Sequence, residues 1–584
     1  MSIKRIFLLV TLVCLFVQCD DDFLDRPDLD TISEPSFWKS TNDLKLYVNR
    51  FYSPKENNKK TFPGWSANQY SGGIYWGDTG TDNIIQPTVS TLMAGNNTED
   101  TGNGSWNFEN IRRANYFMAN YETVEADFDE YKHFVGEALF FRAYFNFTML
   151  KNYGEYPYTN EVLTEVSEEL YAPRTARNTI VQNIIADLDE AIGYMDSGRK
   201  GKGNRLSREI AMLFKARVAL YEGTWEKYHA GTDFGVSGSD GSSFLTIAAS
   251  AANDVISSGI YSIHNTGDPA NDYWNIFNQE NYGGHAEVML WRAYNADLSL
   301  AHNGQRYLSV SGGGRGISKG LVDDYLCTDG QPIAISDKYQ GDADLPAVSA
   351  NRDLRLSQTI WLPGQTMNLD GSTVLKEFTL PDIDLTGESV CVTGYQIRKG
   401  ANPDIKYKTV RQGTTSSPIF RYAEALLIYA EAKAELGTIT QTDVDVSINK
   451  LRARAGMPNL SIGGIVADPN WLYPSLSPII NEIRREWHVE FAVEGYRMNN
   501  LKRWAAMGDV IVGKRVLGAQ FSQTDFPGMV IGQDVQVDAN GYIDAHVNEV
   551  PAGMQFVLGR DYLLPVPRQE LTLNPELTQN PGWN

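Results

Sequence analysis

Hydrophobic residues recur every three or four positions through two long parts of the chain, which is the spacing of amphipathic α-helices. In residues 479–505, for example, Ile483, Trp487 and Phe491 fall on one helical face, and Gly495 indicates a break or close approach before the final turn. The same spacing predicts helices at residues 107–125, 131–153, 175–195, 207–228 and 243–257, and later at 419–436, 442–455 and 479–505.

Paired helices with about 34 residues per pair are typical of tetratricopeptide repeats. We therefore predict a mainly α fold, a tetratricopeptide-like superhelix of about four helix pairs formed by residues 33–258 and 418–508. Between them, residues 260–415 lose the helical period and are predicted to form a long loop-rich insertion with short strands, one of them at 287–294. A C-terminal hairpin and tail follow at 510–584, with a turn at Asn540 and Gly541.

The first residues have the pattern of an export signal. Lys4 and Arg5 precede an apolar run that is too short to span a bilayer permanently, which predicts a signal peptide at residues 1–18. Cys19 closes this segment, and a cysteine in that place suggests lipidation of the new N-terminus after cleavage. Plain secretion with a free Cys19 is the alternative. Residues 19–584 are then expected to form a single domain.

Charge and cysteine content exclude several classes of protein. The chain has 72 acidic and 51 basic residues, a formal charge of −21, and nucleic-acid binding requires a basic face. Cys327 and Cys391 show no zinc-binding spacing, and their pairing is left open. We find no metal-binding motif and no sequence signal for a cofactor. The loop at Asp538–Asp544 fails the pattern of an EF-hand calcium site and fits a hairpin turn.

Three carboxylates, Glu486, Glu490 and Glu494, stand four residues apart on the helix predicted at 479–505. Pairs of carboxylates carry out glycoside hydrolysis, so a catalytic role is one interpretation. The other is that opposite charges on neighbouring helical turns brace the helix, and we favour it. We therefore predict that the protein is not an enzyme, with a secreted glycosidase as the less favoured alternative.

Several motifs along the chain resemble the SusD/RagB family, the outer-membrane glycan-capture lipoproteins of Bacteroidota. One is the E-G-x-R sequence at residues 494–497, followed by Leu501 and an Arg-Trp pair. Another is a block from Glu137 to Pro157, and the chain ends with LPVP at 564–567 and QNPG at 579–582. The resemblance implies a right-handed superhelix of four repeats, a lipid anchor at the cell surface and a non-catalytic binding function.

Sugar rings present apolar C–H faces on which Trp and Tyr can stack, and Asn, Asp and Arg can satisfy their hydroxyls. Two stretches offer this mixture, and the resemblance implies glycan contacts from loops in these same parts of the chain. For any single aromatic, and for Trp291 in particular, packing in the core is an equal alternative. The candidates are Tyr75, Trp76, Asp78, Asp82, Asn83, Trp274, Trp291, Tyr294, Asn295, Arg306 and Tyr307.

The resemblance also implies partners. The expected function is capture of an oligosaccharide and its delivery to a SusC-like TonB-dependent transporter, by a lipoprotein exposed on the outer membrane. Capture of peptides, as in RagB-like relatives, is the alternative with the same architecture.

Overall fold

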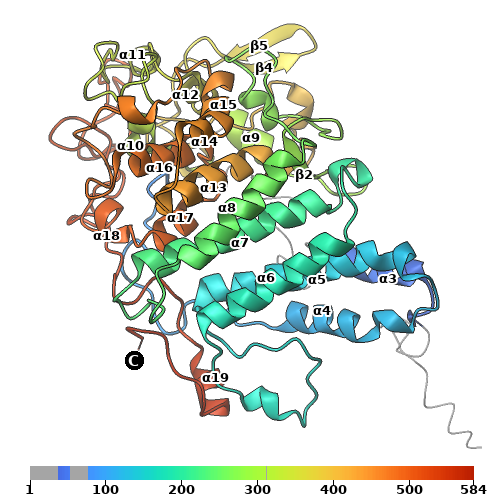
Figure 1. Cartoon of the computed structure of the whole chain (residues 1–584). Coiled ribbons are helices and arrows are strands. Elements are labelled where there is room, and N and C mark those ends of the chain that lie inside the picture. Colours follow the sequence, from blue (N-terminus) through green and yellow to red (C-terminus); the bar gives the residue numbers. More distant parts are fainter. Residues whose placement is uncertain (1–36, 53–76, 311, 584) are drawn as a thin grey trace, which may run out of the picture.

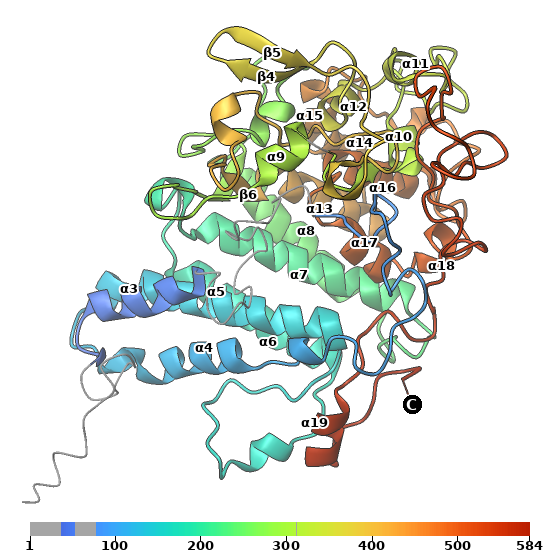
Figure 2. The same cartoon turned by 180° about the vertical axis from the view of Figure 1, so that it is seen from behind.

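The computed structural model describes residues 37–52, 77–310 and 312–583 (Figure 1). Long helices form the lower and middle layers in this view, and a loop-rich part with short strands covers them from above. Figure 2 shows the same division from behind. The prediction of a mainly α fold is confirmed.

The first half of the chain forms the helical layers. Helix α5 packs on α4 and α6, α6 packs on α7, and α7 packs on α8. At one point α7 and α8 come very close, because a Cβ atom on Gly223 would lie 2.8 Å from the backbone nitrogen of Leu245. The helices are α3 (Thr41–Asn49), α4 (Glu109–Asn120), α5 (Phe128–Tyr153), α6 (Arg177–Tyr194), α7 (Arg208–Tyr228) and α8 (Ser242–Ser257).

The helical layers continue after the insertion, since α13 packs on both α8 and α16. Three predictions are corrected here. Residues 419–421 belong to a strand, and the helix predicted at 442–455 is divided at Ser447 into two short helices. The helix predicted at 479–505 ends at Glu490 before a second helix begins at Arg497. The elements are β6 (Ser417–Arg421), α13 (Tyr422–Glu435), α14 (Gln441–Val446), α15 (Ile448–Arg454), α16 (Pro478–Glu490), α17 (Arg497–Arg503) and α18 (Met507–Val510).

The predicted strand in the insertion is confirmed as β2 (Val288–Arg292), which pairs antiparallel with β6. This pairing fastens the insertion to the start of α13. Strands β1 (Ile84–Ile85) and β3 (Gly316–Ile317) also pair, and they join the insertion to the first half of the chain. The other elements are α9 (Gly304–Ser309), α10 (Lys319–Asp324), α11 (Leu345–Ser349), α12 (Leu354–Thr359), β4 (Thr366–Asp370) and β5 (Thr373–Glu377).

The C-terminal segment follows the outside of the molecule. The predicted hairpin is reduced to two isolated bridges, Gln520 to Tyr542 and Val537 to Ile543, around a turn in which Gly541 has φ 84°. The chain then descends to α19 (Arg568–Leu573) at the lower end (Figures 1 and 2). Among the described residues, no helix is both long enough and apolar enough to cross a bilayer.

Two hydrophobic cores lie on either side of α16. The larger one fills the helical layers, and the smaller one lies in the insertion and includes Val489 and Val493. Cys327 and Cys391 are both buried and both free, so the two do not pair.

Candidate functional site

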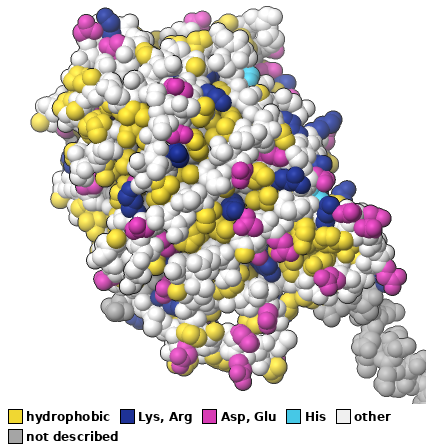
Figure 3. Space-filling view, in the orientation of Figure 1, with side chains coloured by type: hydrophobic (Ala, Val, Ile, Leu, Met, Phe, Trp, Pro, Cys, Tyr) yellow, Lys and Arg dark blue, Asp and Glu magenta, His cyan; other side chains and the backbone are white. Residues whose placement is uncertain are grey.

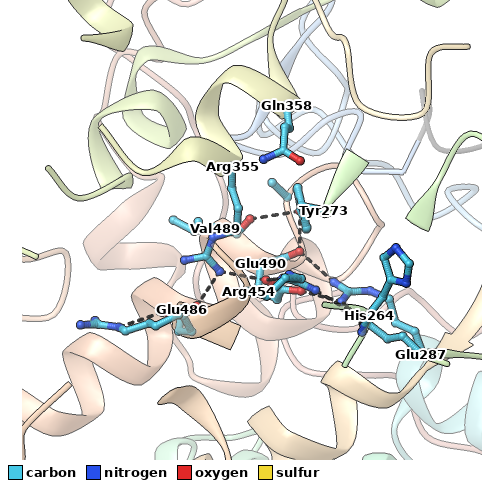
Figure 4. A network of polar contacts seen from close by, with 12 residues as sticks. His264, Tyr273, Glu287, Arg355, Gln358, Arg454, Glu486, Val489 and Glu490 are labelled. Carbon is cyan, nitrogen blue, oxygen red and sulfur yellow. Dashed lines mark hydrogen bonds and ion pairs between the residues drawn. The ribbon is translucent and has the colours of Figure 1, made fainter. Parts of the chain in front are cut away.

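A network of buried charges surrounds α16 (Figure 4). The Glu490 carboxylate accepts hydrogen bonds from Arg421 at 2.6 Å and Arg355 at 2.8 Å, and a third from Arg454. Arg355 also binds Glu486 at 2.6 Å. Burial alone would raise the pKa of Glu490, but the three guanidinium groups outweigh it and hold the pKa well below its usual value.

The partners of these carboxylates correct the sequence interpretation. Bracing was expected between neighbours on one helix, whereas the arginines come from α12, α15 and the end of β6. Glu494 is bound in the same way, by Arg421 at 2.8 Å and Lys399 at 2.7 Å. The side chain of Glu494 is 7% exposed, and Glu490 is fully buried. This network therefore fastens the insertion to the helical layers, and it presents no carboxylate to solvent.

Asp78 shapes the break between α16 and α17. Its carboxylate accepts backbone N–H groups from Val493 at 2.7 Å and Gly495 at 3.0 Å, and the side-chain amide of Asn83 at 3.0 Å. Both Asp78 and Asn83 are 1% exposed. Two of the predicted site residues thus have their polar atoms occupied inside the protein, and this favours a structural role for them.

Asp82 and Asn83 hold two other side chains in place. Asp82 forms a two-point ion pair with Arg497, at 2.9 and 2.6 Å. The ring of His488 lies between Asp324, 2.5 Å away, and the side-chain oxygen of Asn83. Both ring nitrogens of His488 therefore lie within hydrogen-bond distance of a side-chain oxygen. Burial raises the pKa of Asp324, but the hydrogen bond with His488, together with nearby positive charges that include Arg485 and Arg497, outweighs burial and brings the pKa below its usual value.

Three residues of the second predicted stretch serve the local structure. Trp291 is buried and donates its indole N–H to the backbone carbonyl oxygen of Lys202 at 3.0 Å. Tyr294 is also buried, with its ring 4.6 Å from that of His302. Asn295 accepts the backbone N–H of the residue two positions later, so its side chain closes its own turn.

Two further residues of the second predicted stretch, Arg306 and Tyr307, lie on α9. Arg306 on α9 is exposed, and Tyr307 beside it is buried. Burial raises the pKa of Tyr307, and both Arg306 and Arg315 lie near enough to lower it in part. Arg315 donates a hydrogen bond to the Thr79 hydroxyl at 3.2 Å. Thr79 of the first predicted stretch therefore lies beside Arg315, which directly precedes β3.

Trp274 is partly exposed and packs against Arg398, whose guanidinium group lies 4.6 Å from the indole ring and 5.5 Å from the ring of Trp361. The indole N–H of Trp274 and the Nε–H of Arg398 have no hydrogen-bond acceptor among the described residues. Burial lowers the pKa of Arg398 to about 10. An aromatic ring, a cation and two unsatisfied donors thus lie together.

A cleft of about 650 Å³ lies between α10, α16 and α18. Asp82 and His488 line it, together with Lys319, the partly exposed Trp471 and Arg515, and we call it the Asp82 cleft. Sequence reasoning missed Trp471, which lies in a short loop between two prolines, D-P-N-W-L-Y-P. The sequence did contain a signal for this residue, because a tryptophan in a short proline-bounded loop, outside any periodic segment, is a candidate for ligand binding. The described residues contain no cluster of His, Cys, Asp and Glu that would bind a metal.

Three of the sequence candidates, Cys19, Tyr75 and Trp76, lie outside the described residues.

Comparison with known proteins decides the family. A family model described as the SusD family matches residues 257–583. The chain belongs to the SusD/RagB family. A second family model, described as "Starch-binding associating with outer membrane", matches residues 24–220 of this SusD-family chain. SusD-like protein P2 of Formosa agariphila is 24% identical over 581 residues, which are 98% of each chain.

Solved structures share the fold of this SusD-family chain. A SusD-like carbohydrate-binding protein from Bacteroides fragilis superposes with a TM-score of 0.71 at 21% identity, covering 93% of this chain and 100% of the other. A second SusD-like protein from the same species gives a TM-score of 0.69 at 22% identity, covering 95% and 100%.

Proposed function

We propose that this protein binds an oligosaccharide at the cell surface and passes it to a SusC-like TonB-dependent transporter in the outer membrane. Membership of the SusD/RagB family is the observation that carries the proposal. The printed descriptions of its relatives add support, since one model is named for starch binding with the outer membrane and one solved relative for carbohydrate binding. A lipid on Cys19 would supply the anchor.

The Asp82 cleft is the place that we propose for the glycan. Its volume of about 650 Å³ falls within the range of ligand sites, roughly 300–1,000 Å³. Trp471 offers an aromatic face for a sugar ring, and the Asp82 carboxylate, which is paired with Arg497, has further lone pairs that can accept from hydroxyl groups. The side chain of Lys514 on the same wall is exposed.

The surface around α9 is the second place to test. Arg306 is exposed there, and Arg315 joins it to Thr79. Among the described aromatic residues that the sequence predicted for the site, Trp274 is the one that is partly exposed, and it packs against Arg398. Substitution of one tryptophan at a time separates the two places, because Trp274 does not line the Asp82 cleft.

We propose no chemical step. Among the carboxylates considered for glycoside hydrolysis, Glu486 and Glu490 are buried and the side chain of Glu494 is 7% exposed, and all three are bound by arginine or lysine side chains. An ionised carboxylate in such a network has no proton to give to a leaving group. An assay for released reducing sugar would contradict this if activity appeared and was lost in Glu486→Gln.

The experiment is a calorimetric titration of protein lacking residues 1–19 with a panel of oligosaccharides and peptides. We expect one glycan class to bind, and Trp471→Ala to weaken it about tenfold, because ring stacking contributes about 0.5–1.5 kcal/mol beyond the buried area. Loss in Trp274→Ala instead would move the site to the α9 surface. Binding of peptides alone would contradict glycan capture and favour the peptide alternative.

A further inference from the structure

A second pocket, at the lower end of the molecule, shares no lining residue with the Asp82 cleft. It has a volume of about 470 Å³ and lies between α4, the loop that connects α5 to α6, and α19. Its walls are mainly apolar and include Trp106, Phe108, Ile111, Tyr158 and Leu577. We call it the α4–α19 pocket.

One polar side chain in the wall of this pocket is incompletely bonded. Asn115 is 2% exposed, and its amide nitrogen donates to the carbonyl oxygens of Thr159 at 3.2 Å and Glu161 at 2.9 Å. These two bonds fix which end of the amide is the nitrogen. The side-chain oxygen of Asn115 has no donor among the described residues. A buried acceptor without a donor is costly, so a ligand that brings an N–H or O–H group would be favoured here.

The rim of the pocket exposes large apolar side chains. Tyr171 and Leu573 are each 58% exposed, and Leu170 is 44% exposed. All three line the pocket, and Val166, 88% exposed, belongs to the same loop. A group of exposed apolar side chains around an apolar pocket is typical of an interaction site.

The same rim is mainly acidic, and Arg112, the basic residue in the pocket lining, donates a hydrogen bond to the carbonyl oxygen of Leu163. The loop from residue 160 to 171 carries four glutamates and no basic residue, and Glu570 on α19 adds another carboxylate. None of these five has an ion-pair partner within the part of the chain that the structure describes. Figure 3 shows acidic side chains beside hydrophobic ones at this lower end. The loop glutamates are Glu161, Glu165, Glu168 and Glu169.

We propose that the α4–α19 pocket binds a segment of a partner protein that has a large apolar anchor residue flanked by lysine or arginine. The anchor enters between Phe108, Tyr158 and Leu573. A tryptophan or tyrosine suits this place, because its N–H or O–H group can reach the free oxygen of Asn115 while its ring remains in apolar surroundings. The flanking cations meet the glutamates of the rim, which give the interaction its preference for a basic segment.

Short synthetic peptides test the proposal with the full chain. A blocked Lys-Lys-Leu-Trp-Leu-Lys-Lys peptide should bind by fluorescence anisotropy. A peptide with Glu in place of Lys, and one with Ser in place of Leu and Trp, should each bind at least about tenfold more weakly, since charge and apolar anchor both contribute. Equal binding of the basic peptides with and without the apolar residues would overturn the proposal.

Two variants separate this site from general attraction to an acidic protein. Glu161→Gln with Glu165→Gln and Glu169→Gln should weaken the basic peptide about tenfold, because each exposed charge pair contributes about 0.2–1 kcal/mol. The matched control removes three exposed carboxylates of the insertion, Asp337→Asn with Glu377→Gln and Asp384→Asn, and should change affinity less than about twofold.

Leu573→Ser removes an exposed wall residue of the pocket and should weaken the peptide without affecting folding. Unchanged affinity in both Leu573→Ser and the loop variant would overturn the proposal. The proposal would also be overturned if the full chain formed a dimer that Leu573→Ser dissociates, because a second copy of the chain would then occupy the pocket. Glycan titrations should be unaffected by either variant, so this proposal and the proposed function can fail separately.

Discussion

Replacement of Glu490 with Gln tests whether the buried charge network holds the fold together. Gln keeps the size of the side chain but removes the charge that Arg355, Arg421 and Arg454 share. Removal of one partner from a buried ion pair costs about 3–5 kcal/mol. Arg421 keeps Glu494 at 2.8 Å and Arg355 keeps Glu486 at 2.6 Å, so we expect the lower end, about 3 kcal/mol.

The measurement is urea unfolding of wild type and variant, followed by tryptophan fluorescence. Because the folded-state pKa of Glu490 lies well below its ordinary value of 4.5, its contribution to stability is present above that pH and is lost as pH falls through the folded pKa. The difference between the two proteins should therefore be largest near pH 7 and should shrink below about pH 4.5.

The control for this experiment is Glu377→Gln on β5, an exposed strand, which should change the free energy of unfolding by less than about 0.5 kcal/mol. A destabilisation by Glu490→Gln of less than about 1 kcal/mol at pH 7 would refute the reasoning. A difference from wild type that does not depend on pH would refute it as well.

Three further results are expected. Gly223→Ala should lower the free energy of unfolding by about 1–3 kcal/mol, because the added methyl group would press on the α8 backbone. Gly193→Ala, on α6 with open space around it, should raise the free energy of unfolding by about 0.5–1 kcal/mol. Thermal unfolding of the two variants compares these effects. Burial raises the pKa of Glu226 to about 7, so ionisation of this side chain destabilises the folded state as pH rises. In urea titrations, Glu226→Gln should therefore raise the free energy of unfolding by up to about 3 kcal/mol at pH 8 but by little at pH 5. In protein lacking residues 1–19, Cys327 and Cys391 should react with a thiol reagent only after unfolding, because both are buried and burial raises the pKa of Cys391 to about 11. Rapid labelling of the native protein would contradict this expectation.

The helices were predictable because each one buries a regular stripe, and that period is present in the local sequence. The end of α16 was not, because it depends on a residue far away in the chain. Asp78 binds the backbone N–H groups of Val493 and Gly495, which then cannot continue the helix. The strand at 419–421 was not predicted for a similar reason, because its strand partner β2 is also far away in the chain.

The candidate site was predictable in part. Composition indicated which residue types would bind a sugar, and Asp82 does line the largest of the clefts described above. Burial was the missing information, because sequence cannot tell that Asn83 and Trp291 face inward. Trp471 was missed since it lies outside the two aromatic stretches and reaches the cleft only through the packing of α16 and α18.

The location of Arg421 has a consequence for the order of folding. This residue stands at the start of α13, and its guanidinium group binds Glu287 from the insertion as well as Glu490 from α16. The carboxylates of α16 can be buried only when arginines from both sides are in position, because an unpaired buried charge is too costly. The α16 layer therefore cannot complete its packing before the insertion has folded. We expect the two cores to form and melt in one cooperative step.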